Sequence, residues 1–149
     1  HFGQINLPLS TSYQENRSFA RPYRLKSRDV LNNVFENGEK VKSWPVILHF
    51  IDTALPEAVP CQAAVSVSKK RFKRAVDRNR IKRLLREAWR LEKIPVEKAL
   101  HAHGKQRAIV FIFTGKEMPT YEAILLCVQT VLKKMPLPSD ASENEEVLS

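Results

Sequence analysis

The chain has 149 residues, of which 43% are hydrophobic, and this suits one compact domain with a buried core. Its 25 lysines and arginines exceed its 16 aspartates and glutamates, so the formal net charge is +9 and the expected partner is a polyanion, either nucleic acid or an acidic membrane surface. No apolar run approaches the ~18 residues that a membrane span needs, and we expect a soluble, cytoplasmic protein.

The first predicted elements follow an N-terminal arm. Residues 1–20 mix Ser, Asn, Gln and Pro without an apolar period, which predicts an extended or disordered arm. A helix is expected between Ser27, a suitable N-cap, and Gly38, which ends it; its apolar face consists of Val30, Leu31, Val34 and Phe35. Residues 46–51 and 62–68 are rich in β-branched side chains and predict two strands.

The second half of the chain predicts two helices around a third strand. A long basic helix runs to about residue 92 and ends before Pro95, and residues 107–113 form the strand. Thr120 is expected to cap the last helix, whose apolar stripe is Ile124, Leu125, Val128, Val131 and Leu132. The order α-β-β-α-β-α predicts an α+β sandwich with helices packed on one small sheet. We expect the domain to span residues 21–136 and the acidic tail, residues 137–149, to be disordered.

The net charge is concentrated in one segment. Residues 69–90, KKRFKRAVDRNRIKRLLREAWR, carry eleven Lys or Arg against Asp77 and Glu87, and the difference of nine equals the charge of the whole chain. At about 100° per residue, one side of the helix collects Ile81, Leu84, Leu85, Ala88 and Leu91, with Trp89 at its boundary, where the indole can pack or stack. The other side collects Arg78, Asn79, Lys82, Arg83, Arg86 and Arg90.

This basic side predicts contact with nucleic acid. A helix that only faces solvent gains nothing by crowding like charges without acidic partners at i+4. Arginine forks bind phosphates in a bidentate manner, and Asn79 can reach a base edge or a 2′-hydroxyl, so structured RNA is favoured.

A basic helix of this kind has three other possible functions. A leucine-zipper basic region would continue into heptads, but Pro95 interrupts the helix. A membrane-surface or calmodulin-target helix is usually an appendage, whereas this helix lies between two predicted strands. A general RNA-binding protein, such as a ribosomal protein, would have much the same composition, and composition alone leaves that alternative open.

The sequence contains no recognisable catalytic or metal site. The carboxylates are scattered without a DxD or ExxE arrangement, and the stretch with His101 and His103 is expected to be a turn with no carboxylate nearby in sequence. Cys61 and Cys127 lack metal-ligand spacing and are expected to be buried thiols in a reducing compartment. These observations favour a binding protein over a catalyst.

The segment SVSKK followed by RAVDRNRIKRLLREAWR resembles the bacterial ribonuclease P protein component, whose signature is an SKK strand end that leads into an RNR helix. RLKSRDVLNNVFENG at 24–38 is similar to the family's first helix, and PTYEAILLCVQTVLKKM at 119–135 to its last. The resemblance covers roughly residues 24–135.

The resemblance implies a ribosomal-protein-S5-like fold with a left-handed βαβ crossover, although ordinary crossovers are right-handed. It also implies an endoribonuclease whose active site and Mg²⁺ belong to a catalytic RNA, which removes the 5′ leader from precursor tRNA. The protein would contribute no catalytic residue, metal ligand or cofactor of its own. Its partners would be precursor tRNA and one catalytic RNA, in a heterodimeric ribonucleoprotein.

The resemblance also assigns two binding surfaces. The first, which docks on the catalytic RNA, comprises Lys69, Lys70, Arg74, Arg78, Asn79, Arg80, Lys82, Arg83 and Arg86. The second is a cleft between the first helix and the sheet, which binds the single-stranded leader and includes Leu31, Phe35 and His49. Many family members have aromatic residues at the positions of Leu31 and His49, and Leu31 on its own would be read as an ordinary core residue. A nonenzymatic binder of structured RNA remains the alternative.

Overall fold

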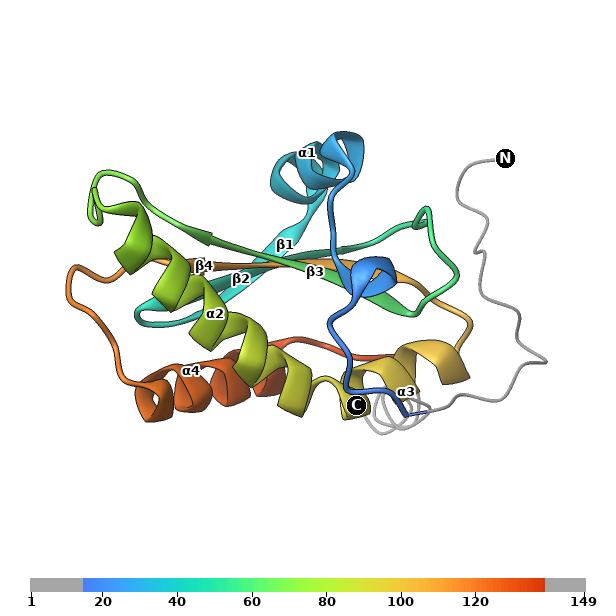
Figure 1. The fold of residues 1–149 in the computed structure, drawn as a ribbon. Coiled ribbons are helices and arrows are strands. Elements are labelled where there is room, and N and C mark those ends of the chain that lie inside the picture. The colour runs from blue at the N-terminus through green and yellow to red at the C-terminus, as the bar shows by residue number, and fades with distance from the viewer. Residues whose placement is uncertain (1–14, 139–149) are drawn as a thin grey trace, which may run out of the picture.

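A four-stranded sheet separates one helix from three others. The computed structural model describes residues 15–138. The strand order is β1-β2-β4-β3, and α1 lies on one face of the sheet while α2, α3 and α4 lie on the opposite face (Figure 1). The α+β class predicted from the sequence is therefore confirmed. The elements in chain order are the 3-10 helix η1 (Arg21–Tyr23), α1 (Arg28–Asn37), β1 (Glu39–Ser43), β2 (Val46–Asp52), β3 (Cys61–Val67), α2 (Ala75–Glu92), α3 (Ile94–Ala102), β4 (Arg107–Phe113) and α4 (Tyr121–Lys134).

The sheet combines antiparallel and parallel pairing. β2 is antiparallel to both of its neighbours, β1 and β4, whereas β3 is parallel to β4. Parallel neighbours need a long crossover connection. Here α2 and α3 supply it, so the basic helix belongs to the βαβ unit of the fold.

Helices α1 and α4 begin at the predicted caps. The Ser27 side chain accepts a hydrogen bond from Val30 N at 3.3 Å, and the Thr120 side chain accepts one from Ala123 N at 3.1 Å. Gly38 is the C-cap of α1, where the backbone becomes extended. A glycine is required here because a Cβ at this position would collide with the backbone carbonyl groups of Val34 and Phe50.

The predicted order of elements is wrong in one respect, because it lacks the strand β1 and the helix α3. β1 was not predicted, because EKVKS has one apolar residue and this edge strand is recognisable mainly from its backbone pairing with β2. α3 was not predicted either, because Pro95 was read as a terminator. Proline is tolerated in the first turn of a helix, where no N–H is needed, and Pro95 lies in the first turn of α3.

The strand predictions are correct to within one residue. β4 has the predicted bounds, β2 extends one residue further, and β3 is shifted by one residue toward the N-terminus. Residues 1–14 of the predicted arm and 139–149 of the predicted tail lie outside the described residues.

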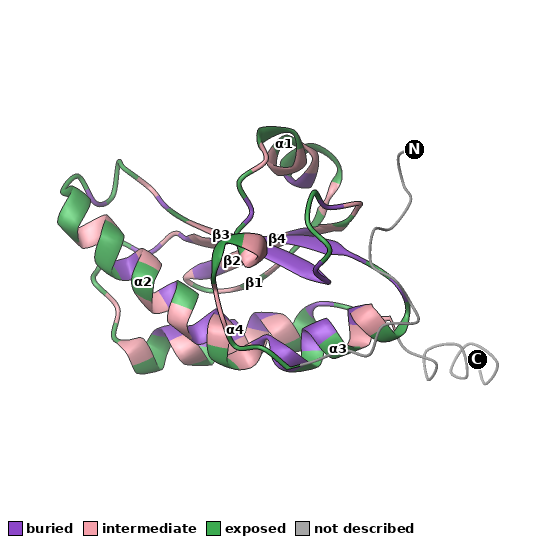
Figure 2. Cartoon of the chain, turned by 45° about the vertical axis from the view of Figure 1, so that its right-hand side comes forward, coloured by how far each residue is buried: buried purple, intermediate pink, exposed green. Residues whose placement is uncertain are grey.

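The two faces of the sheet bury separate groups of apolar side chains. Val46, Leu48, Phe50, Ile109, Phe111 and Phe113 pack toward α2 and α4, and Ala108 and Val110 pack toward α1. The alternation follows from the two-residue period of a strand. Figure 2 shows that buried residues are concentrated in the strands and recur along one side of the helices. Trp89 was placed at the boundary of the basic helix but is only 2% exposed, and its ring centroid lies 5.6 Å from that of Phe111. The buried face of α2 is thus rotated toward Trp89 and away from Leu91. Leu91 is 39% exposed, so its predicted place on the core side is wrong.

Cys61 and Cys127 are buried free thiols, as predicted. Burial raises the pKa of both thiols above its ordinary value, so neither is activated as a thiolate. In the described part of the chain, no helix combines the length and the apolar character that crossing a bilayer requires.

Candidate nucleic-acid interface

Helix α2 has the two faces that its sequence predicts. Ile81, Leu85, Ala88 and Trp89 are buried against the rest of the protein. Arg80, Arg83 and Arg86 are exposed, and so is Asn79. The packing of the apolar face fixes the rotation of the helix, and this in turn directs the arginines to solvent.

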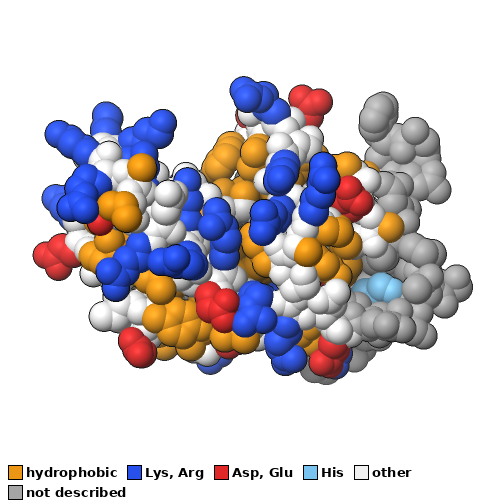
Figure 3. Space-filling model, viewed as in Figure 1, with side chains coloured by type: hydrophobic (Ala, Val, Ile, Leu, Met, Phe, Trp, Pro, Cys, Tyr) orange, Lys and Arg blue, Asp and Glu red, His pale blue; other side chains and the backbone are white. Residues whose placement is uncertain are grey.

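The basic surface continues from α2 into the loop before it. Lys and Arg side chains gather over the loop between β3 and α2 and over the beginning of α2 (Figure 3). The exposed cations of this region are Lys69, Lys70, Arg71, Lys73, Arg74 and Arg80. A single-sign surface of this size raises the local concentration of a polyanion.

Acidic side chains neutralise little of this surface. Asp77 lies 3.7 Å from Arg74, and Glu87 lies 2.6 Å from Arg90. Both pairs are at the ends of the predicted basic side. Within residues 15–138, five cations between them form no salt bridge: Arg78, Arg80, Lys82, Arg83 and Arg86. Their charge is therefore available to an external anion.

Arg78 has a structural contact that the sequence pattern did not reveal. Its Nη1 atom donates hydrogen bonds to the carbonyl oxygens of Phe72 and Lys73, at 2.8 Å and 2.9 Å. The guanidinium thus ties the loop before α2 to the first turns of the helix. Only part of its five-donor fork remains for a phosphate.

The second predicted surface lies beside α1. The side chain of Phe35 is 49% exposed, and its ring contacts the His49 ring edge-on, with 5.0 Å between centroids. Burial, together with the charge of Lys40, lowers the pKa of His49, so the imidazole is neutral at pH 7. Leu31 is half-buried in the apolar cluster between α1 and the sheet. The structure therefore brings Phe35 and His49 together. Leu31 lies one turn before Phe35 in α1 and packs against the sheet.

Three more side chains lie on the same face of the sheet as this surface. Ile47 is paired with Ile112, and Ile112 with Ser66, so these three residues form a row on the α1 face across three strands. The first two are half-buried and Ser66 is exposed, because α1 does not extend over this row. The alternation of the predicted strands places these side chains on one face, but it does not show how far the helix covers them.

The two histidines considered as catalytic groups occupy the end of α3. His101 is in the last turn and His103 is the C-cap, whose Nδ1 atom lies 3.1 Å from Ala99 O. The predicted turn is therefore helical up to residue 102. Within residues 15–138 no three His, Cys, Asp or Glu side chains come together in an arrangement that could hold a metal ion.

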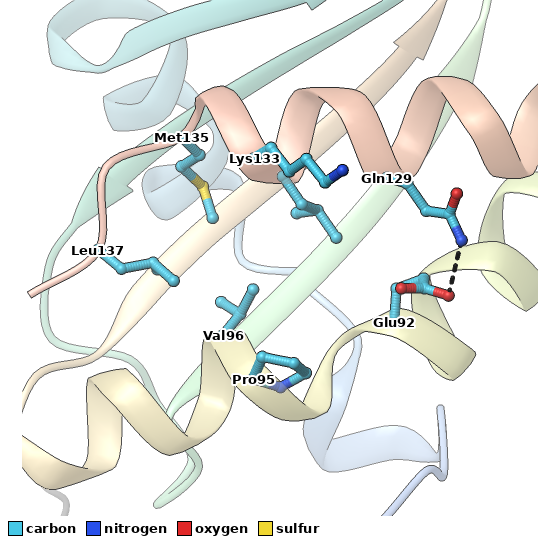
Figure 4. Close-up of a pocket in the computed structure, with 8 residues that line it drawn as sticks. Glu92, Pro95, Val96, Gln129, Lys133, Met135 and Leu137 are labelled. Carbon is cyan, nitrogen blue, oxygen red and sulfur yellow. Dashed lines mark hydrogen bonds between the residues drawn. The ribbon is translucent and has the colours of Figure 1, made fainter.

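A cavity of about 550 Å³ lies away from both surfaces, between α3 and α4 (Figure 4). Its walls include Pro95, Val96 and Met135, and at one end Gln129 Nε2 donates to Glu92 Oε2 at 3.2 Å. The cavity contains one lysine and one carboxylate among mainly apolar side chains. It lacks the concentration of positive charge that α2 has.

Comparison with known proteins identifies relatives of the chain. The sequence model of the family described as Ribonuclease P matches residues 19–136. The ribonuclease P protein component of Porphyromonas gingivalis (strain ATCC 33277) is 36% identical over 124 residues, which cover 82% of this chain and 90% of the relative. The corresponding protein of Chlorobaculum tepidum is 33% identical over 137 residues, which cover 86% and 89%.

Solved structures share the fold at lower sequence identity. The RNase P protein of Staphylococcus aureus has a TM-score of 0.62 at 24% identity and covers 78% of this chain and 98% of its own. The RNase P protein of Thermotoga maritima has a TM-score of 0.61 at 21% identity and covers 76% and 97%. Together with the sequence matches, which extend over most of the described residues, they show that the chain belongs to the ribonuclease P protein family.

Proposed function

We propose that the chain is the RNA-binding protein subunit of ribonuclease P, and that it assists a catalytic RNA in removing the 5′ leader from precursor tRNA. The observation that carries this proposal is the basic face of α2, which has no acidic partners over its central part and is held in place by the fold. Family membership supports the same assignment, since the relatives are ribonuclease P protein components.

The face of α2 and the loop before it would dock on the catalytic RNA. The residues proposed for this contact are Lys69, Lys70, Arg74, Arg78, Asn79, Arg80, Lys82, Arg83 and Arg86. Arginine forks match the geometry of phosphate oxygens, and a structured RNA presents many phosphates to one rigid helix. The role of this surface is to position the two subunits, and base recognition is a minor part of it.

The surface beside α1 would bind the leader. Phe35 offers a half-exposed ring on which an unpaired base can stack, and His49 supports that ring from β2. Leu31 contributes packing beneath them. Single-stranded RNA has bases free to stack, whereas the mature tRNA end lacks these nucleotides.

The chemical step would belong to the RNA. The catalytic RNA would hold Mg²⁺ at the scissile phosphate, and the protein would bring precursor tRNA and RNA together. The endoribonuclease would be a ribonucleoprotein of this chain and one RNA, acting in the cytoplasm. The protein would need no cofactor of its own.

A binding experiment separates this proposal from a general RNA-binding function. The protein is titrated against a bacterial ribonuclease P RNA and against a structured control RNA of equal length, over a series of salt concentrations. We expect tighter binding to the ribonuclease P RNA at every salt concentration. Equal affinities for the two RNAs would contradict the proposal and favour the nonenzymatic RNA-binding alternative.

A further inference from the structure

The segment that precedes α1 is held firmly against the rest of the fold. Lys93 Nζ donates a hydrogen bond to Ser18 O at 2.6 Å, and Leu25 N donates one to Ala63 O at 2.9 Å. The second contact adds residues 24–25 to the outer edge of β3 as a short parallel extension of the sheet. Side chains of this segment therefore have fixed positions relative to α2.

A hollow of about 230 Å³ lies between this segment, the outer edge of β3 and α2. Ala63, Ala64 and Val65 form its floor, and two cations from the leading segment and one from α2 stand around it: Arg24, Lys26 and Arg86. Among residues 15–138, no acidic side chain lines the hollow. The leading segment and α2, which are distant in sequence, thus place three positive charges around one opening beside β3.

The cations of the hollow are not neutralised by the protein. None of the three forms a salt bridge within residues 15–138. Arg24 uses its Nε atom to donate to Phe19 O at 2.9 Å, and its two terminal nitrogens make no hydrogen bond in the described part of the chain. Partial burial and the nearby charge of Arg24 lower the pKa of the Arg86 guanidinium, which nevertheless stays charged. An anion in the hollow would relieve the repulsion between these like charges.

The strand edge adds a backbone donor. In a parallel pair, residues two apart direct their N–H and C=O groups to the same side. The carbonyl of Ala63 points outward to Leu25, so the N–H of Val65 points outward as well. The pairing with the leading segment is a single bridge at Arg24 and Ala63 and does not continue to Val65. Its N–H is left facing the hollow.

We propose that this hollow binds a phosphodiester group of the RNA, with Arg24, Lys26 and Arg86 supplying charge and Val65 N–H supplying a hydrogen bond. A phosphodiester has two free oxygens that accept bonds from a guanidinium fork and from a backbone N–H. The inference rests on the proposed RNA-binding function. It extends the interface from α2 to the leading segment, whose Arg24 and Lys26 the sequence pattern did not single out.

The substitution Lys26→Gln tests the site with little risk to the fold, because Lys26 is exposed and forms no hydrogen bond or salt bridge within residues 15–138. We expect the magnitude of the slope of log affinity against log salt for the ribonuclease P RNA to fall by roughly 0.7–0.9. This corresponds to about four- to sixfold weaker binding than that of the unsubstituted protein at 0.15 M salt, if the two proteins bind equally at the 1 M reference state. Lys133→Gln on α4, an equal change of charge at another exposed lysine, should leave the slope unchanged.

Two results would overturn the site without affecting the proposed function. If Lys26→Gln and Lys133→Gln are indistinguishable while the unsubstituted protein prefers ribonuclease P RNA, the hollow is not a phosphate site. If low millimolar inorganic phosphate displaces the RNA, the hollow is a site for free phosphate. The converse result, loss of slope in Lys26→Gln without any preference for ribonuclease P RNA, would support the phosphodiester site and refute the assignment to ribonuclease P.

Discussion

Individual arginines on α2 differ in what they contribute to the protein itself. Arg78 donates two hydrogen bonds to the loop before the helix, whereas Arg83 is exposed and makes no hydrogen bond or salt bridge within residues 15–138. Their positions in sequence give no hint of this difference, because both lie on the polar side of the same helix.

Substitution of these two arginines should separate RNA binding from stability. Arg83→Gln should lower the salt slope of RNA binding by roughly 0.7–0.9 and leave the melting temperature unchanged. Arg78→Gln should weaken RNA binding and also cost about 1 kcal/mol of folding free energy, or about 2–4 °C in melting temperature. Calorimetry and salt-dependent titrations measure the two effects, and an unchanged slope in Arg83→Gln would show that the face is only solvated.

Substitution of Phe35 should also affect RNA binding more than stability. Because the ring is half-exposed and contacts His49, Phe35→Ala should cost less stability than loss of a core phenylalanine. We expect the holoenzyme to bind precursor tRNA roughly 5- to 150-fold more weakly, from a stacking energy of ~1–3 kcal/mol, with mature tRNA binding unaffected.

Val34→Ala is the matched control for Phe35→Ala, because Val34 is the preceding residue of α1, is fully buried in the core cluster and is not among the proposed leader contacts. This variant should lower the melting temperature more than Phe35→Ala does. If folded Phe35→Ala loses equal affinity for precursor and mature tRNA, the ring does not contact the leader.

At the scale of elements, local patterns predicted the parts of the fold that local contacts determine. Ser27 and Thr120 are caps whose hydrogen bonds reach three residues along the chain, and both were predictable. β1 and α3 were not, since β1 depends on pairing with β2 and Pro95 is compatible both with the end of one helix and with the start of the next.

The same distinction between local and long-range contacts decides how much of the candidate surfaces could be predicted from the sequence. The period of α2 predicted its exposed arginines, and the structure corrects this pattern only at its edge, at Trp89 and Leu91. The hollow around Arg24 and Arg86 depends on contact between the leading segment and β3, across about 40 residues of chain, and no short-range pattern specifies it.

The junction of α2 and α3 contains a buried ion pair that should be important for stability. Lys93 Nζ lies 3.3 Å from the Glu97 carboxylate, and the two side chains are 0% and 1% exposed. Lys93 also binds the leading segment through Ser18 O, and its ammonium lies 3.7 Å from the centroid of the Tyr23 ring. One side chain thus connects the helices to the segment that carries Arg24.

Lys93→Met should destabilise the protein by about 3–5 kcal/mol, because it removes the cation from beside a buried carboxylate. The double variant Lys93→Met/Glu97→Gln should recover part of that loss, and denaturant unfolding measures both. Equal stability of the single and double variants would show that the ion pair itself contributes little and that packing of the lysine chain dominates.

At the scale of the whole molecule, the fold separates two surfaces around one sheet. α2, which carries the basic face, lies on one face of the sheet, and α1 lies on the opposite face (Figure 1). The space-filling view shows Lys and Arg over the beginning of α2, and between that end and α1 the outline is hollowed (Figure 3). One domain therefore offers two separate surfaces, as the proposed function requires of a subunit that binds a catalytic RNA and its substrate together.

Cleavage of precursor tRNA tests this account most directly. The protein, a bacterial ribonuclease P RNA and the two together are each incubated with precursor tRNA at low Mg²⁺, and the 5′ ends of the products are mapped. We predict cleavage at the mature 5′ end only with both components present, because the proposed function gives the protein the binding and positioning of RNA and gives the reaction to the RNA subunit. Robust cleavage by the protein alone, abolished in the His101→Ala/His103→Ala variant, would contradict the account.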